Sequence, residues 1–344
     1  MTIQTDFHIH SDFSADSHSS MESMIQEGIR LGLKTMCFTE HLDLDFPYED
    51  ISFDLDIPGY RQTFETLREK YQSQIELLFG IELGLQPHLS AQLQEVLTYA
   101  PFDFVIGSTH LVNRTDPYYP EYFKDRSDHE AFRQYFEEVL KNIKSFPHFD
   151  TLGHLDYIVR YSPNKSKNYQ WTDYRDLIDP ILSFLIQSDL ALEVNTAGLK
   201  YGLGQPNPAP EILKRYYQLG GRKITIGSDA HCPAHLAYDF STLPVLLNAC
   251  GFHQYTGIVS PIRKTLFPRF DDTTASHDCV VFIKYHTLSR RNCTLWLFKS
   301  TQYRSIFPFL DGTRCARMVI ADFSCDHPFF IQILHPHKID MVAQ

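Results

Sequence analysis

The sequence predicts an α/β fold in which seven parallel strands close into a distorted barrel of the (β/α)7, TIM-like kind. Seven β-like runs recur in order along the chain: TDFHIH, TMCFTEH, IELLFGIEL, FDFVIGSTHL, TLGHLDYI, LALEVNT and KITIGSDAH. Helix-like stretches separate these runs, and regular alternation of strands with helices is typical of a parallel sheet with helical crossovers. Seven such repeats in about 250 residues favour a barrel over an open sheet.

The clearest helical stretch covers residues 21–34. Its apolar side chains recur at the spacing of one helical face, and Ser19 with Glu22 has the spacing of a capping box. Residues 129–146 repeat the helical pattern, and so do residues 208–220, which carry proline near their start. These stretches fall between the predicted strands, as barrel crossovers require.

Composition indicates a globular protein outside the membrane. The chain has 344 residues, of which 43% are hydrophobic and 14% aromatic, so it can bury a large core. No window reaches the roughly 18 uninterrupted apolar residues of a membrane span, and the N-terminus MTIQTDFHIH lacks the features of a signal peptide. Seven cysteines without a C-x-x-C pair fit neither a disulfide framework nor a thiolate zinc cluster. We therefore expect a cytoplasmic protein with reduced thiols.

The charge is distributed unevenly along the chain. The formal net charge of −11 argues against general nucleic-acid binding, which needs a basic surface. From Phe252 onward the chain holds 11 basic residues, 7 aspartates and no glutamate, a net charge of +4, whereas the part before Phe252 has a net charge of −15. We therefore predict a boundary near Gly257, with a barrel in residues 1–257 and an atypical tail in residues 258–344.

Two interpretations of the tail are possible. One is an added small domain that binds zinc, but its four cysteines lack the close paired spacing of zinc ribbons: Cys279, Cys293, Cys315 and Cys325. The other is a slip of the coding frame near Thr256, after which the sequence was never selected to fold. We favour the second, because the change of composition is abrupt and no helical or strand period persists beyond it. The tail would then be disordered or poorly packed.

Each of the seven runs ends in residues that bind metals or transfer protons. In chain order these are His8 and His10, Glu40 and His41, Glu82, His110, His154, Glu193, and Asp229 with His231. His8 and His10 are two apart on a strand, so their imidazoles point to the same side. In α/β barrels the chemistry lies where strands end and βα loops begin. The run ends therefore predict a metal site with at least six nitrogen and oxygen ligands at one mouth of the barrel.

These motifs resemble those of the PHP (polymerase and histidinol phosphatase) family, and most of all its histidinol-phosphate phosphatase branch. The resemblance covers about residues 6–256 and lies in DFHIHSDFSADS, FTEHLD, GIELG, IGSTHLV, GHLDYIVRY, LEVNTAGL and IGSDAH, in that order. It implies a distorted seven-stranded barrel with two or three metals at its C-terminal rim. It also implies hydrolysis of L-histidinol phosphate in histidine biosynthesis.

The resemblance implies a ligand set for each metal. His8, His10, Glu82 and Asp229 hold the first metal, and Glu82 bridges to a second that His110 and His154 complete. A third lies between Asp16, His41 and His231; many relatives carry histidine in the place of Asp16. Imidazole and carboxylate ligands, without thiolate, suit zinc, manganese or iron.

Substrate recognition needs further residues. Bound metals make water more acidic and clamp phosphate. Hydrolysis by such a site needs no serine or cysteine nucleophile. In agreement with this, the sequence has no G-x-S-x-G elbow or Walker A loop. We assign Glu82, Asp229 and Arg160 to catalysis, with Arg160 forking onto the phosphate oxygens. Glu193 and Asn195 share one face of a strand and are expected to contact the other end of the substrate. Alternatively, Glu193 orients a metal-ligating histidine.

Two other functions are considered. One is a PHP module that serves a DNA polymerase as a nuclease or an interaction domain, but the sequence holds no polymerase portion and the barrel is strongly acidic. The other is a phosphoesterase for nucleotides or phosphodiesters that uses the same metals. We expect a small-molecule phosphate monoester as the partner and neither nucleic acid nor a membrane. The sequence leaves the oligomeric state open.

Overall fold

A computed structural model describes residues 2–49, 51–255, 281–283, 295–297, 307–311, 314–319, 330–335 and 338–343. The chain divides into two compact units, Met1–Pro268 and Arg269–Gln344. The first unit holds the predicted seven strands in one parallel sheet, hydrogen-bonded in sequence order. They are β1 (Thr5–Ile9), β2 (Thr35–Leu42), β3 (Glu76–Gly84), β4 (Phe104–Ser108), β5 (Thr151–Leu152), β6 (Ala191–Asn195) and β7 (Ile224–Gly227).

Contacts between the first and last strands nearly close the sheet into a barrel. Ile9 forms a parallel bridge with Ala230, and the His10 amide donates to the Ala230 carbonyl at 2.9 Å. The buried carboxylate of Asp6 accepts hydrogen bonds from both the amide and the hydroxyl of Ser228, at 2.9 and 2.5 Å. The predicted seven-stranded barrel is confirmed.

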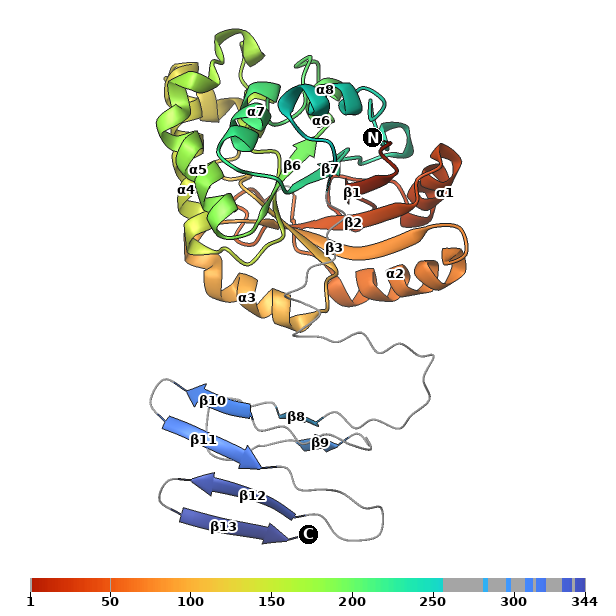
Figure 1. Cartoon of the computed structure of the whole chain (residues 1–344), viewed down its shortest axis with the longest axis vertical. Coiled ribbons are helices and arrows are strands. Elements are labelled where there is room, and N and C mark those ends of the chain that lie inside the picture. The colour runs from red at the N-terminus through yellow and green to blue at the C-terminus, as the bar shows by residue number, and fades with distance from the viewer. Residues whose placement is uncertain are drawn as a thin grey trace. The chain divides into compact units, whose positions relative to one another are not determined.

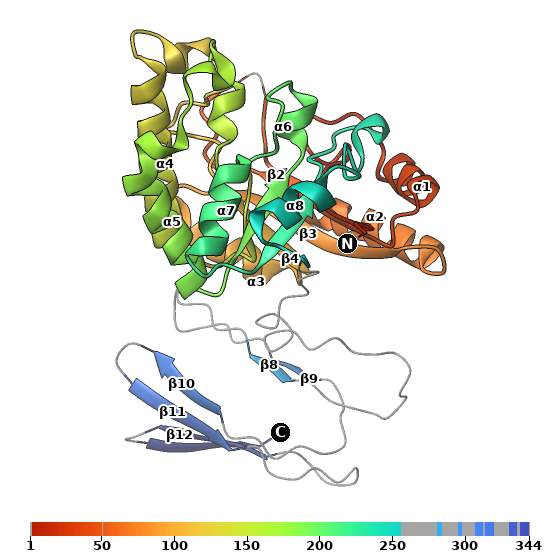
Figure 2. The same cartoon turned by 45° about the horizontal axis from the view of Figure 1, so that its top comes forward.

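Helices surround the strands (Figure 1). They are α1 (Met21–Leu31), α2 (Ile57–Tyr71), α3 (Ser90–Tyr99), α4 (Asp128–Ser145), α5 (Arg175–Gln187), α6 (Ala197–Lys200), α7 (Pro210–Gln218) and α8 (Leu243–Cys250). In Figure 2, α4, α5, α7 and α8 follow one another around the sheet. None of the helices in the described part of the chain combines the length and apolar character of a membrane span.

Local differences from the predicted elements are small. The N-cap of α1 is Ser20, whose side chain accepts the Ser23 amide, so the predicted Ser19–Glu22 capping box is wrong by one residue. In α4 a capping box does form, between Ser127 and Glu130. The fifth strand has only two residues, because the chain leaves the sheet at Gly153 and then forms a 3₁₀ turn over Tyr157–Arg160. Although it is short, this strand still positions the residues that follow it, including His154.

The interior of the barrel is apolar at one end and polar at the other. Side chains two apart on a strand share a face, so Leu78 and Glu82 of β3 both point inward, as do Cys37 and His41 of β2. Apolar side chains from four strands form a small buried cluster inside the barrel: Phe7, Cys37, Leu78, Phe104 and Ile106. The inward residues nearer the carboxyl ends of the strands are histidines and carboxylates, so the sequence pattern itself places a polar site at this mouth.

The described residues of the second unit form six short strands. A two-stranded antiparallel pair joins β8 (Val281–Ile283) to β9 (Leu295–Leu297). A four-stranded antiparallel sheet is formed by β10 (Phe307–Asp311), β11 (Arg314–Val319), β12 (Phe330–His335) and β13 (Lys338–Ala343). The predicted boundary near Gly257 lies outside the described residues. That residues 258–344 were never selected to fold stays a prediction.

Candidate metal centre

The structure brings all nine predicted metal-binding side chains together at the mouth of the barrel. They form one continuous network, in which neighbouring nitrogen and oxygen atoms are 3.0–3.8 Å apart. Its members are His8, His10, Asp16, His41, Glu82, His110, His154, Asp229 and His231. Residues up to 223 positions apart in the sequence therefore meet at one place, because the strand ends of a barrel share one rim.

Glu82 lies at the centre of this network. Its Oε2 is 3.0 Å from Nε2 of His8 and 3.0 Å from Nδ1 of His41. Its Oε1 is 3.0 Å from Nε2 of His154 and 3.3 Å from Nε2 of His110. The two oxygens of one carboxylate thus face two different pairs of imidazoles, which is the arrangement that a bridging ligand needs.

The surroundings of Glu82 favour the negatively charged form of its side chain. The side chain is fully buried, and burial by itself raises the pKa of a carboxyl group. The imidazoles outweigh this effect, His8 most strongly, and hold the pKa of Glu82 well below its usual value. Ser108 also donates a hydrogen bond to Oε1 at 2.6 Å. Glu82 is therefore a carboxylate that is ready to bind a cation.

His8 is oriented from behind by Glu193. The two side chains meet at 2.5 Å between Nδ1 of His8 and Oε1 of Glu193. Glu193 also accepts hydrogen bonds from the His154 amide at 2.7 Å and from the Asn195 side chain at 3.2 Å. A carboxylate that accepts from Nδ1 fixes that proton, so that Nε2 of His8, which faces Glu82, would supply its lone pair to a bound cation.

This geometry revises the expected substrate contact of Glu193 and Asn195. Both side chains are buried, and the oxygen of Asn195 accepts the Ala197 amide at 2.9 Å. They lie behind His8 and use their hydrogen bonds within the protein. These contacts favour the alternative interpretation, in which Glu193 orients a metal-ligating histidine. The sequence pattern did not separate the two, because the same strand position serves either role.

His10 is oriented by a chain of hydrogen bonds that sequence reasoning missed. The Ser14 hydroxyl donates to Glu40 at 2.6 Å and lies 3.0 Å from Nδ1 of His10. Since a hydroxyl has one proton, Ser14 accepts from Nδ1, and Nε2 of His10 keeps its lone pair. That Nε2 is buried and has no hydrogen-bond partner among the described residues. Burial, then His41 and His231, hold the pKa of His10 well below its ordinary value, so the ring is neutral.

His110 has a similar partner in Asp43, which sequence reasoning also missed. Nδ1 of His110 lies 2.8 Å from Oδ1 of Asp43, so Nδ1 donates there while Nε2 faces Oε1 of Glu82 at 3.3 Å. A signal for Asp43 was present, because it follows His41 by two residues at the end of β2 and so shares its face. Glu40, left unassigned from the sequence, accepts the Ser11 amide and hydroxyl as well as the Ser14 hydroxyl.

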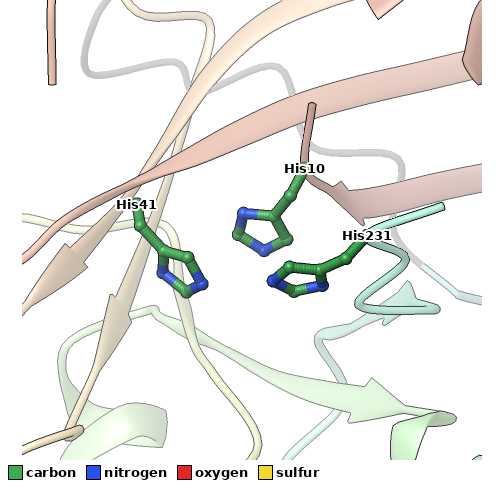
Figure 3. Close-up of side chains that lie close together, drawn as sticks. All are labelled: His10, His41 and His231. Atoms are coloured by element: carbon green, nitrogen blue, oxygen red, sulfur yellow. The ribbon is translucent and has the colours of Figure 1, made fainter. Parts of the chain in front are cut away.

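Three imidazoles come together at the outer side of the centre (Figure 3). The ring of His10 stacks on those of His41 and His231, with centroids 4.1 and 4.2 Å apart. Their ring nitrogens form a group within 4.8 Å of one another. Asp16 lies beside this group, with Oδ2 3.1 Å from Nε2 of His231 and 3.8 Å from Nε2 of His41.

Arg160 reaches the centre through Asp229. Its Nη1 is 3.5 Å from Oδ2 of Asp229, while Oδ1 of that carboxylate is 3.6 Å from Nε2 of His10. Nη2 donates to the Tyr161 hydroxyl at 2.6 Å. The guanidinium also lies 4.6–5.0 Å from the ring centres of Tyr157, Tyr161 and Tyr201. Arg160 thus lies at the centre, where Asp229 and Tyr161 hold its guanidinium.

The donor set fits divalent cations. Four groups of three side chains hold their ligand atoms within 4.8 Å of one another: His10–His41–His231, His8–His10–Glu82, His41–Asp43–His110 and Glu82–His110–His154. All donors are imidazole nitrogens or carboxylate oxygens, which suit transition metals. Several buried imidazole nitrogens, including Nε2 of His10, have no hydrogen-bond partner within the described part of the chain, and their lone pairs are those that a bound cation would use. The centre therefore offers several adjoining sites for divalent metals.

The seven-stranded barrel and the cluster of histidines and carboxylates at its mouth define the class to which the protein belongs. The family model of the PHP domain matches residues 6–197, and the chain belongs to this family. It is 32% identical over 255 residues to the histidinol-phosphatase of Lactococcus lactis subsp. lactis IL1403, a match that covers 72% of this chain and 92% of the relative. It is 33% identical to a protein of Clostridium acetobutylicum named as a probable histidinol-phosphatase, covering 72% and 93% of the two chains.

A solved structure shows the same likeness in three dimensions. The crystal structure of histidinol phosphate phosphatase from Lactococcus lactis, in complex with zinc, L-histidinol and phosphate, superposes with a TM-score of 0.68 at 31% identity. The superposition covers 74% of this chain and 96% of that one. The expected family and fold are confirmed.

Proposed function

We propose that this protein is a metal-dependent histidinol-phosphatase, which hydrolyses L-histidinol phosphate to L-histidinol and phosphate in histidine biosynthesis. The central observation is the position of Glu82, whose two oxygens face two different pairs of histidines. The 32% identity to the Lactococcus lactis histidinol-phosphatase extends over nearly the whole of that relative. A phosphate monoester placed at this mouth would meet a cluster of cation sites and the guanidinium of Arg160.

We assign nine ligands to up to three metals. His8, His10, Glu82 and Asp229 hold the first, Glu82, His110 and His154 the second, and Asp16, His41 and His231 the third. The geometry supports the first two sets through the distances around Glu82. It supports the third through Asp16, whose Oδ2 lies 3.1 Å from Nε2 of His231 and 3.8 Å from Nε2 of His41.

Divalent ions at these positions would supply positive charge to the phosphoryl oxygens and make a nearby water more acidic. The remaining work falls to the protein. Arg160 presents a planar fork that matches two phosphate oxygens, and its contacts to Asp229 and Tyr161 keep that fork at the mouth. Glu193, Asp43 and Ser14 keep the ring protons of three histidines on the nitrogen that faces away from Glu82.

Zinc is the metal we propose first. The imidazole and carboxylate donors suit zinc, manganese and iron alike, and the related Lactococcus lactis enzyme was crystallised with zinc. Reconstitution of metal-free protein with each of the three ions would rank them by kcat/KM. As a biosynthetic enzyme for a small metabolite, the protein is proposed to work in the cytoplasm.

A substrate panel tests the proposed function. L-histidinol phosphate, a set of nucleoside monophosphates and bis(p-nitrophenyl) phosphate, a phosphodiester, are compared by kcat/KM under one set of conditions. We expect L-histidinol phosphate to exceed the others by at least about a hundredfold. A preference for nucleotides would support the general phosphoesterase. A preference for the diester would support the nuclease-like alternative.

A further inference from the structure

Arg160 lies on a segment that follows the two-residue strand β5 and has little regular structure of its own. This Arg160 segment, residues 156–168, contains two 3₁₀ turns, Tyr157–Arg160 and Lys165–Asn168, and no strand. Because the segment lies outside the sheet, contacts with other parts of the barrel must fix its position. The guanidinium of Arg160 meets Asp229 through a single 3.5 Å pair. Its place at the mouth therefore depends on how the segment is held.

Asp156 anchors the start of the Arg160 segment. This buried carboxylate accepts hydrogen bonds from the Asn207 side-chain amide at 2.6 Å and from the Ala209 backbone amide at 2.9 Å. The backbone of Asn207 in turn pairs with that of Asn195, the last residue of β6. The start of the segment is therefore tied to the sheet just before the turn that carries Arg160.

Asp128, in the first turn of α4, anchors the remainder of the Arg160 segment. Its Oδ1 accepts the Ser162 hydroxyl at 3.0 Å. Its Oδ2 accepts the side-chain amides of Asn164 and Asn168, both at 2.9 Å. The Ser162 hydroxyl also accepts the Asn164 backbone amide at 3.1 Å. One carboxylate thus contacts the segment at three residues, and the first of them, Ser162, is buried and closely follows Arg160 in the chain.

The contacts of Asp128 serve the Arg160 segment rather than its own helix. Ser127 and Glu130 already cap α4 as a reciprocal capping box. The side-chain hydrogen bonds of Asp128 in the described part of the chain go instead to side chains of the Arg160 segment. Burial raises the pKa of Asp128, but these hydrogen bonds outweigh it and hold the pKa below its ordinary value. Asp128 is therefore a charged carboxylate, and both of its oxygens accept hydrogen bonds from the segment.

We propose that Asp128 is a positioning residue for Arg160, which holds the Arg160 segment so that the guanidinium lies at the metal centre. This inference rests on the proposed function, in which Arg160 contacts the phosphate of the substrate. None of the hydrogen bonds described for Asp128 reaches a proposed metal ligand, so its effect on hydrolysis passes through Arg160. Without Asp128 the segment is free to shift, and a shift of about 1 Å in a group that positions the substrate is enough to lower catalysis.

A double-mutant cycle tests this role. The effect of Asp128→Ala is measured in the unmodified enzyme and in Arg160→Ala, with L-histidinol phosphate and with p-nitrophenyl phosphate, two monoesters that share the phosphate group. In the unmodified enzyme we expect Asp128→Ala to lower kcat/KM about tenfold for both esters, with the metal content unchanged. In Arg160→Ala the same substitution should change kcat/KM by less than about twofold, because the group that Asp128 positions is gone.

Asp176→Ala is the matched control. Asp176 also lies in the first turn of a helix, α5, but its carboxylate is exposed and pairs with Arg133 of α4. This variant loses the same charge at the same kind of helix position and should keep the kcat/KM of the unmodified enzyme.

Equal losses from Asp128→Ala in both backgrounds would show a general structural effect and overturn the inference. No loss in the unmodified background, or a loss of bound metal, would also overturn it. Unmodified enzyme that hydrolyses p-nitrophenyl phosphate but not L-histidinol phosphate would instead refute the proposed function. The cycle measured with p-nitrophenyl phosphate would then still decide whether Asp128 acts through Arg160.

Discussion

Nδ1 of His8 lies 2.5 Å from Oε1 of Glu193, and both side chains are buried beneath the metal centre. The contact links the first strand of the barrel to the sixth. It makes Glu193 a positioning residue, because the carboxylate touches the far side of the ring rather than the mouth. The neighbouring Gly227 is needed for this approach, since a Cβ there would overlap both His8 and Glu193.

Replacing Glu193 by glutamine tests this positioning role. Glutamine retains an oxygen for Nδ1 of His8 but loses the charge that strengthens the contact. We expect the affinity for metal to fall by about tenfold to a hundredfold, as for other partners of metal-bound histidines. Competition with a chelator measures this affinity. At saturating metal, KM for L-histidinol phosphate should return to that of the unmodified enzyme. A raised KM at full metal content would instead favour direct contact with the substrate.

Glu82→Gln should be far more damaging, because one carboxylate faces both pairs of histidines. Glutamine keeps the size of the side chain but removes the charge that two metals would share. We expect metal content below two ions per chain and a loss of at least about a thousandfold in kcat/KM. Metal analysis and steady-state kinetics measure the two effects. Glu76→Gln, on the same strand but exposed, is the control. Near-normal turnover of Glu82→Gln with full metal content would contradict the ligand assignment.

Arg160→Lys keeps the charge but removes the planar fork. We expect kcat/KM for L-histidinol phosphate to fall by an amount that corresponds to about 1–3 kcal/mol of transition-state stabilisation. Metal content should not change, because Arg160 contacts Asp229 through a single 3.5 Å pair. Arg61→Lys on α2 serves as the control, because Arg61 is exposed and pairs with Glu65. Unaltered kinetics in Arg160→Lys would remove this residue from the site.

Truncation after Gly257 tests the prediction for the tail. The described barrel residues continue to Tyr255, whose hydroxyl accepts the Gln4 amide at 3.3 Å. Phe252 is buried against Tyr216 and Tyr217. We expect the chain that ends at Gly257 to keep the activity and the free energy of unfolding of the barrel.

A chain that ends at Gly251 provides the comparison, because it loses Phe252. We expect it to lose about 3–5 kcal/mol of stability, the usual effect of deleting a buried phenylalanine side chain. Thermal and denaturant unfolding measure the difference. If the chain that ends at Gly257 unfolded or lost activity, residues 258–344 would be a true part of the enzyme.

The fold was predictable because two patterns in the sequence indicate the same barrel. Strand-like and helix-like stretches alternate along the chain, and each strand-like stretch ends in residues that can bind a metal. His8 and His10, or Leu78 and Glu82, share a face through the period of two, and the barrel rim then brings such residues together. Other features depend on tertiary contacts. Ser20 rather than Ser19 caps α1, because capping depends on the turn geometry as well as the spacing. Asp43 and Ser14 orient histidines through hydrogen bonds whose partners the sequence does not reveal.

Removal and return of metal test the central claim most directly. Protein treated with a chelator and shown by elemental analysis to be metal-free is assayed with L-histidinol phosphate, before and after titration with zinc. The account predicts that hydrolysis is lost with the metal and returns as at least two ions bind per chain. Metal-free protein that hydrolyses L-histidinol phosphate at the original rate would contradict it.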